Sequence, residues 1–138
     1  MKKRTALLLS VVMAISMLIA SVFPASAEGI SPRLTNADTA TVAFTITSSG
    51  AAHFSVDYTG IAGEFTEARL TVKIEKQFLW FFWTEVDSWS ATCYERLGFF
   101  THTFYLNESG TYRANYRLEF YGTSGDVDVI ENTREDSY

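Results

Sequence analysis

The sequence predicts an all-β fold, specifically an antiparallel β-sandwich of about seven strands with an immunoglobulin-like arrangement. Apolar and polar residues alternate with a period of two over several stretches between residues 40 and 130, which is typical of strands that bury one face. Turn-forming residues separate these stretches at regular intervals, and beyond the N-terminal segment no apolar pattern with helical spacing is long enough for a helix. A small barrel is the alternative architecture.

Three alternating stretches come first. Residues 40–47 place apolar side chains at even positions and mostly threonine at odd positions, and a turn at residues 48–50 ends them. Residues 52–58 and 68–75 repeat the alternation, with apolar side chains again at even positions and a glycine-containing break at residues 60–63. We therefore expect three strands whose even-numbered side chains enter the core.

Two later stretches predict further strands. In residues 99–106 either register leaves large apolar groups outside, and we favour Phe100, Phe104 and Leu106 as the inward set. Residues 112–120 alternate over their whole length, with apolar side chains at even positions. These two stretches add strands to the same core.

Two further features lie near the C-terminus. Gly110-Thr111-Tyr112 has the form of a tyrosine corner, in which the phenol bonds the preceding backbone. A turn at residues 122–125 then leads into a last strand with Val127 and Val129, and with Asp126 and Asp128 on its outer face.

The N-terminus is typical of a secretory signal peptide. Residues 2–4 are basic, residues 6–23 are mostly apolar, and Ala25-Ser26-Ala27 is a small-residue cleavage signature. We expect cleavage after Ala27, which leaves residues 28–138 as a single domain. The alternative is an N-terminal membrane anchor, because an apolar segment of this length is close to the lower limit for spanning a bilayer.

Charge and cysteine content restrict the partners. The formal net charge of the chain is −5, and loss of the three basic residues of the signal peptide makes it −8. This acidity argues against nucleic acid as a partner and against electrostatic attraction to anionic lipid. Cys93 is the only cysteine, and a secreted domain without a disulfide is more typical of a bacterium, here one with a single membrane.

The residues for a catalytic or metal site are sparse. His53 and His102 are isolated, no Gly-x-Ser-x-Gly motif is present, and no zinc-ligand spacing includes Cys93. Asp126 and Asp128 could hold calcium only loosely, because the calcium-loop signature is missing. The sequence therefore predicts a protein that is not an enzyme and has no cofactor, and a hydrolase with an unrecognised site is the remote alternative.

If the alternation of the third strand continued, Lys76 would lie on the core side. An unbroken run of apolar residues follows it. The strand is therefore expected to end or bulge there, and a reversal within residues 77–82 would place several rings at a hairpin tip. Exposed clusters of this kind usually mark a contact surface. The alternatives are a central strand buried on both faces, or a run covered by the N-terminal arm, residues 28–38. The candidate binding residues are Phe78, Leu79, Trp80, Phe81, Phe82, Trp83 and Trp89.

Trp83, Val86 and Trp89 recur at a spacing of three. In a strand this spacing alternates faces, so we expect one tryptophan in the core and the other across the opposite face unless a bulge intervenes. A flat tryptophan could stack on a sugar ring beside one of the tyrosines Tyr94, Tyr105 and Tyr121.

Four short motifs carry a family resemblance. They are Ile30-Ser31-Pro32-Arg33, Thr35-Asn36, Trp83-x-x-Val86-x-Ser88-Trp89-Ser90 and Gly110-x-Tyr112-Arg113. With them the chain resembles small secreted β-rich proteins of Gram-positive Firmicutes that carry a signal peptide, over nearly all of residues 28–138. Members often have a short polar turn where this chain has residues 78–82. The resemblance implies secretion and a β-rich fold, and it implies no activity.

These observations predict an extracellular binding module whose partner is a protein, a glycan or a lipid surface and whose oligomeric state stays open. The alternative is a membrane-active protein of bacteriocin-like type that inserts the hairpin of residues 78–83 into a target membrane.

Overall fold

The computed structural model describes residues 33–138, so the predicted signal peptide and its cleavage site after Ala27 lie outside the described residues. The described residues contain strands and no helix, and hence no helix able to cross a membrane. The strands are β1 (Ala37–Ile46), β2 (Ala51–Gly60), β3 (Phe65–Phe78), β4 (Phe82–Cys93), β5 (Leu97–Tyr105), β6 (Thr111–Gly122) and β7 (Val127–Ser137).

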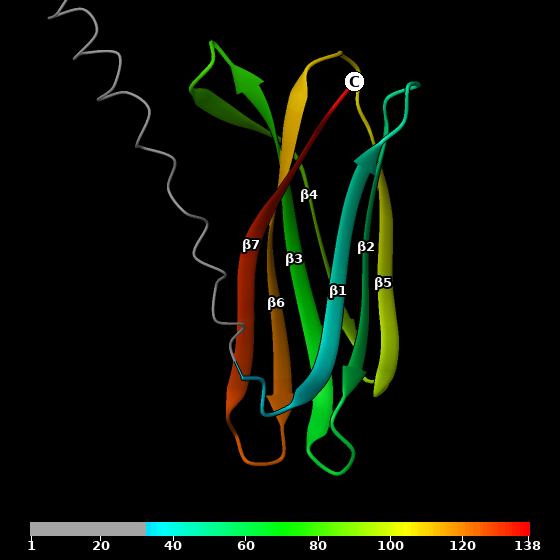
Figure 1. Cartoon of the computed structure of the whole chain (residues 1–138), viewed down its shortest axis with the longest axis vertical. Coiled ribbons are helices and arrows are strands. Elements are labelled where there is room, and N and C mark those ends of the chain that lie inside the picture. Colours follow the sequence, from blue (N-terminus) through cyan, green and yellow to red (C-terminus); the bar gives the residue numbers. More distant parts are fainter. Residues whose placement is uncertain (1–32) are drawn as a thin grey trace, which may run out of the picture. The chain divides into compact units, whose positions relative to one another are not determined.

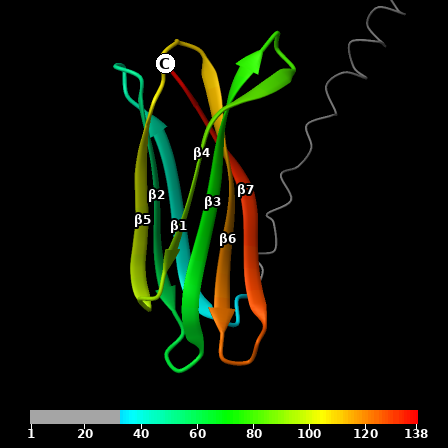
Figure 2. The same ribbon diagram turned by 180° about the vertical axis from the view of Figure 1, so that it is seen from behind.

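The strands form two antiparallel sheets that face each other, as the predicted sandwich requires (Figures 1 and 2). One sheet has the order β1-β2-β5, and the other has the order β4-β3-β6-β7. In a constant-type immunoglobulin domain the fourth strand lies beside the fifth, whereas β4 here pairs with β3. The β-sandwich is confirmed, and its closer assignment as immunoglobulin-like stays a prediction.

The core lies between the sheets and consists of the strand faces that the sequence predicts to be buried. The even-numbered side chains of β2, of β6 and of residues 68–74 in β3 are buried, and the odd-numbered ones face outward. In β5, Phe100 and Phe104 are buried as predicted. Aromatic pairs connect the two sheets, with ring centroids 5.3 Å apart for Tyr58 and Phe120 and 5.6 Å apart for Phe54 and Tyr116.

Tyr112 forms the predicted corner. It is buried, and its hydroxyl donates a hydrogen bond of 2.5 Å to the carbonyl oxygen of Glu108, four residues earlier. Burial raises the pKa of this phenol, so the hydroxyl keeps its proton and remains a donor.

The predicted orientation of β7 is wrong. Val127 and Val129 face outward, whereas the carboxylate of Asp128 turns toward the N-terminal arm and accepts hydrogen bonds from the backbone of Thr35 and Asn36. Unpaired backbone N–H groups are costly to bury, so a carboxylate that satisfies them can take an inward position. Asp128 is therefore a structural acceptor rather than an outer-face residue.

Candidate functional site

The apolar run forms the turn of the β3–β4 hairpin. Phe78 pairs with Phe82, and residues 79–81 connect the strands. Leu79 has φ 49° and Trp80 has φ 72°, and both values lie in the left-handed region, which favours glycine and asparagine. Left-handed backbone costs other residues about 1–2 kcal/mol each, so this turn holds large apolar side chains at positions that disfavour them.

Residues 78–82, here called the aromatic tip, are all exposed. Their relative exposures are 60% for Phe78, 58% for Leu79, 91% for Trp80, 71% for Phe81 and 55% for Phe82. In Figures 1 and 2 the β3–β4 hairpin diverges from the other strands at one end of the sandwich. Of the alternatives that the sequence left open, the structure has the exposed hairpin, and a strand buried on both faces is excluded.

The N-terminal arm does not cover the tip within the described residues. Thr35, Asn36 and Ala37 bond to Asp128 at the start of β7, whereas the hairpin leaves the sandwich near the other end of β6, where Lys76 pairs with Tyr112. Residues 28–32 of the predicted arm lie outside the described part of the chain.

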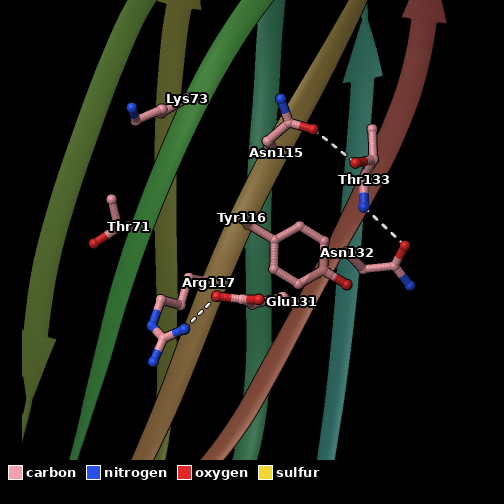
Figure 3. A pocket seen from close by; sticks show the side chains of 8 residues that line it. All are labelled: Thr71, Lys73, Asn115, Tyr116, Arg117, Glu131, Asn132 and Thr133. Atoms are coloured by element: carbon pink, nitrogen blue, oxygen red, sulfur yellow. Dashed lines mark hydrogen bonds and ion pairs between the residues drawn. The ribbon is translucent and has the colours of Figure 1, made fainter.

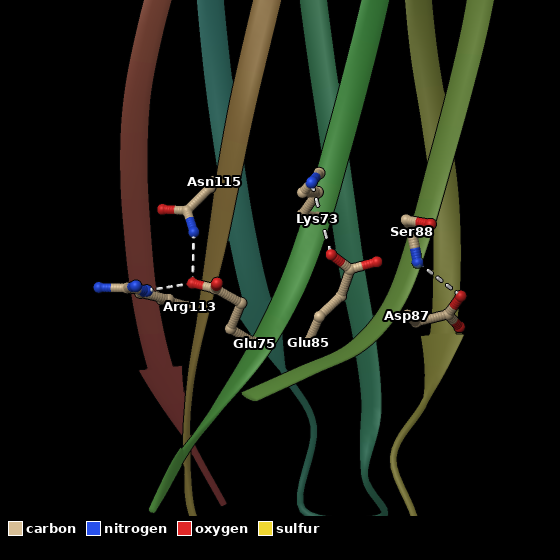
Figure 4. Close-up of polar contacts among 7 residues, drawn as sticks. All are labelled: Lys73, Glu75, Glu85, Asp87, Ser88, Arg113 and Asn115. Carbon is tan, nitrogen blue, oxygen red and sulfur yellow. Dashed lines mark hydrogen bonds and ion pairs between the residues drawn. The ribbon is translucent and has the colours of Figure 1, made fainter. Parts of the chain in front are cut away.

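Trp83 lies on the outer face of the second sheet, beside the tip. Its ring contacts the guanidinium of Arg113, whose Cζ is 4.2 Å from the ring centroid. Glu75 holds this arginine in place, since its carboxylate accepts bonds of 2.5 Å from Arg113 Nε and from Asn115 Nδ2 (Figure 4). A network of charged and amide groups therefore supports the base of the hairpin.

A bulge explains why Trp83 faces outward. The β3–β4 register shifts between Ile74 and Glu75, because Ile74 pairs with Asp87 and Glu75 with Glu85, which leaves Val86 as an extra residue. Without it, Trp83 and Trp89 would share a face, since they are six residues apart. The two tryptophans do lie on opposite faces, but the bulge causes this, whereas the expectation from the spacing assumed that no bulge was present.

Trp89 is far less exposed than the tip. Its side chain packs against the core, stacks on His102 with ring centroids 4.6 Å apart and meets the edge of Phe100. The tyrosines named as sugar-stacking partners are dispersed, and Arg69 already covers the ring of Tyr121. The predicted binding residues thus divide into a contiguous set, residues 78–83, and Trp89, which supports the core.

The tip carries no charge. Lys76 and Glu85 are the first charged residues on either side, and the intervening residues 77–84 are uncharged. The side-chain amide of Gln77 donates a hydrogen bond of 2.9 Å to the carbonyl oxygen of Trp80. This bond satisfies a polar group of the turn without water.

Ion pairs flank the uncharged stretch. Lys76 bonds to Glu108, and this contact raises the pKa of the lysine and lowers that of the glutamate, so both stay charged. Lys73 Nζ lies 3.5 Å from Glu85 Oε2 on the outer face (Figure 4).

A polar groove lies on the outer face of the second sheet (Figure 3), with a volume of about 510 Å³. Its side chains largely bond to one another, as Arg117 does to Glu131 and as Thr133 Oγ1 does to Asn115 Oδ1 at 2.6 Å. The groove is open, and several of its polar side chains already have hydrogen-bond or ion-pair partners. It is therefore a weaker candidate binding site than the tip. Sequence reasoning did not anticipate it, because its residues come from three strands.

The remaining reactive residues are dispersed. Cys93 is half-buried against the core, His53 is exposed on the first sheet, and His102 is stacked on Trp89. Within residues 33–138 no group of three or more histidine, cysteine, aspartate and glutamate side chains has the geometry of a metal site.

No protein-family model, curated protein or solved structure matches this chain.

Proposed function

We propose that this protein is a secreted, single-domain binding module that acts without catalysis and contacts its partner through the aromatic tip. The observation that carries the proposal is the exposure of five consecutive large apolar side chains, each more than half exposed. A patch of this kind on a folded domain usually marks an interaction surface. The N-terminal sequence and the resemblance to secreted β-rich proteins support an extracellular setting.

The energetics of the tip are sufficient for specific binding. Burying three of its rings would contribute roughly 6–9 kcal/mol before the costs of association are subtracted. The strained turn adds to the argument, because unfavourable backbone conformations persist where the surrounding structure enforces them and often occur at binding sites. A turn selected only for stability would carry asparagine and glycine.

The alternative function, a membrane-active protein of bacteriocin-like type, would use the same hairpin. A membrane-crossing strand needs about 9–11 residues compatible with lipid, whereas the uncharged stretch contributes only Gln77 and Phe78 from β3 and residues 82–84 from β4. A binding surface requires no such length, and this favours the first function.

Retention on isolated cell envelopes tests the proposal, because envelopes present protein, glycan and lipid together. The chain starting at Glu28 is expected to be retained, and Trp80→Ala and Phe81→Ala are expected to reduce retention at least about tenfold. Phe99→Ala is the matched control, since Phe99 is 69% exposed but lies on the first sheet. Equal retention of parent and tip variants would remove the aromatic tip from the function.

A further inference from the structure

We propose that the partner of the aromatic tip is the surface of a zwitterionic lipid bilayer, in which the tip acts as a shallow anchor. This inference rests on the proposed function and specifies its partner. It follows from the shape, the charge, the backbone hydrogen bonding and the reach of the tip.

The shape of the tip suits a fluid surface. Trp80 is 91% exposed at the turn, and its neighbours on both sides are also exposed, so the tip is convex. Figures 1 and 2 show it on a narrow hairpin that projects from the sandwich. A protein partner would need a deep complementary pocket for such a projection, whereas acyl chains and headgroups rearrange around it.

Polar groups at the tip are compatible with lipid. Residues 77–84 carry no charge, and a charge at hydrocarbon depth would be strongly unfavourable. The bond of 2.9 Å from Gln77 Nε2 to the Trp80 carbonyl satisfies an acceptor at the turn. An unpaired carbonyl would cost much more in lipid than in water, so this bond matters most in a bilayer.

The reach of the tip sets the depth of insertion. Trp80 lies four residues beyond Lys76, which at about 3.4 Å per residue is at most about 14 Å. Interfacial segments bury their apolar groups about 5–10 Å below the headgroups, whereas the hydrocarbon core is about 30 Å thick. The tip therefore enters one leaflet, and Trp83 with Arg113 would lie at headgroup level, where tryptophan is favoured.

The negative charge of the chain favours zwitterionic lipid over anionic lipid as the partner. With a net charge of −8 beyond the signal peptide, the domain is repelled by anionic headgroups. Three carboxylates, those of Glu75, Glu85 and Glu108, lie around the base of the hairpin, and each is paired with a single lysine or arginine. No excess positive charge is available there for anionic lipid.

Vesicle binding by the chain starting at Glu28 tests the inference. Because the strands of the described residues 33–138 all lie within residues 37–137, this chain contains the whole described sandwich, and circular dichroism checks its fold. We expect saturable co-flotation with phosphatidylcholine vesicles and a blue shift of tryptophan emission. At low salt, vesicles containing phosphatidylserine should bind more weakly, and encapsulated dye should not be released when binding saturates.

Three variants locate the contact. Phe81→Ser should weaken vesicle binding at least about tenfold. Phe99→Ser is its matched control, because the two phenylalanines are 71% and 69% exposed, and it should bind like the parent. Trp80→Phe should keep most of the binding but lose most of the blue shift, because Trp80 is the reporter at the turn.

Each contrary result has a distinct meaning. If phosphatidylcholine vesicles bind nothing while retention on envelopes still depends on Trp80 and Phe81, the lipid partner is wrong and the binding module stands. Dye release at binding concentrations would overturn shallow insertion in favour of the bacteriocin-like function. Equal vesicle binding by the parent and Phe81→Ser would overturn the anchor.

Discussion

Asp128 fixes the start of the folded domain through one carboxylate. It accepts hydrogen bonds from the backbone nitrogens of Thr35, Asn36 and Ala37, at 2.9, 2.6 and 3.3 Å. The buried amide of Asn36 then donates to the carbonyl oxygens of Phe120 and Asp126. Gly122 makes this possible, because a side chain at that position would collide with the Asn36 amide.

These bonds predict how stability depends on pH. Burial of Asp128 opposes ionisation, but the hydrogen bonds from Thr35, Asn36 and Ala37 outweigh it and lower the pKa of the carboxyl group. A lowered folded-state pKa gives stability that is present above the ordinary aspartate pKa, near 4, and is lost as the pH falls through the folded value.

Asp128→Asn should therefore destabilise the domain at pH 7 by about 1 kcal/mol, a value discounted because the carboxylate is partly exposed. The difference from the parent should shrink below about pH 4, because the parent then loses the same charge. Urea unfolding at pH 7, 5 and 3 measures this difference, with Asp57→Asn on the exposed face of β2 as control. A difference that is constant with pH would contradict the assignment.

At the scale of the element, the β3–β4 hairpin combines a bulge with a strained turn. The bulge at Val86 turns Trp83 to the outer face, and the turn places Leu79 and Trp80 in left-handed backbone. The sequence predicted the reversal, because Lys76 broke the alternation. It could not predict the turn type, since neither residue is a usual occupant of left-handed positions.

Replacing the turn should separate stability from binding. Leu79→Asn with Trp80→Gly places residues that tolerate left-handed backbone at both positions, so we expect the free energy of unfolding to rise by about 1–2 kcal/mol. Binding to envelopes and vesicles should fall at least about tenfold, because two tip side chains are lost. Urea unfolding and co-flotation of the same sample measure both.

Either contrary outcome is informative. An unchanged unfolding midpoint would show that the native turn is not strained, and unchanged binding would show that the tip is not the contact.

Across the whole molecule, the two open sides of the sandwich are held differently. Along the β1–β7 side, carboxylates of β7 bond to backbone nitrogens of the arm and β1, where Asp136 accepts from Ile46 at 2.6 Å and Asp128 holds residues 35–37. Along the β4–β5 side, Trp89 of β4 stacks on His102 of β5. Hydrogen bonds therefore hold the β1–β7 side, and stacking of aromatic rings holds the β4–β5 side.

This contrast predicts opposite roles for two tryptophans. Trp89→Ala should destabilise the domain by about 2–4 kcal/mol, because it leaves a void between the sheets. Trp80→Ala should change the free energy of unfolding by less than about 0.5 kcal/mol, since its side chain is exposed. Thermal or urea unfolding of both variants measures the contrast, and a similar cost for each would mean that Trp89 is no more structural than the tip.

Alternation along the chain was enough to predict β1, β2, β3 and β6 and the core faces of these strands, and a short motif was enough to predict the corner at Tyr112. Each of these depends on a residue's own side chain and near neighbours, which a period of two encodes directly. The sequence left exposure of the tip open, because five apolar residues in a row cannot all face one core but can be buried on both faces of a central strand.

The inward orientation of Asp128 in β7 and the separation of Trp89 from the tip depend on groups that lie far away in the chain or in the opposite sheet. Asp128 turns inward because of Thr35, 93 residues earlier, and Trp89 stacks on His102 of the opposite sheet. Such contacts arise only when the sheets pack together, because the same aspartate or tryptophan is locally compatible with either face. Tertiary structure therefore decided which aromatic residues support the fold and which remain exposed.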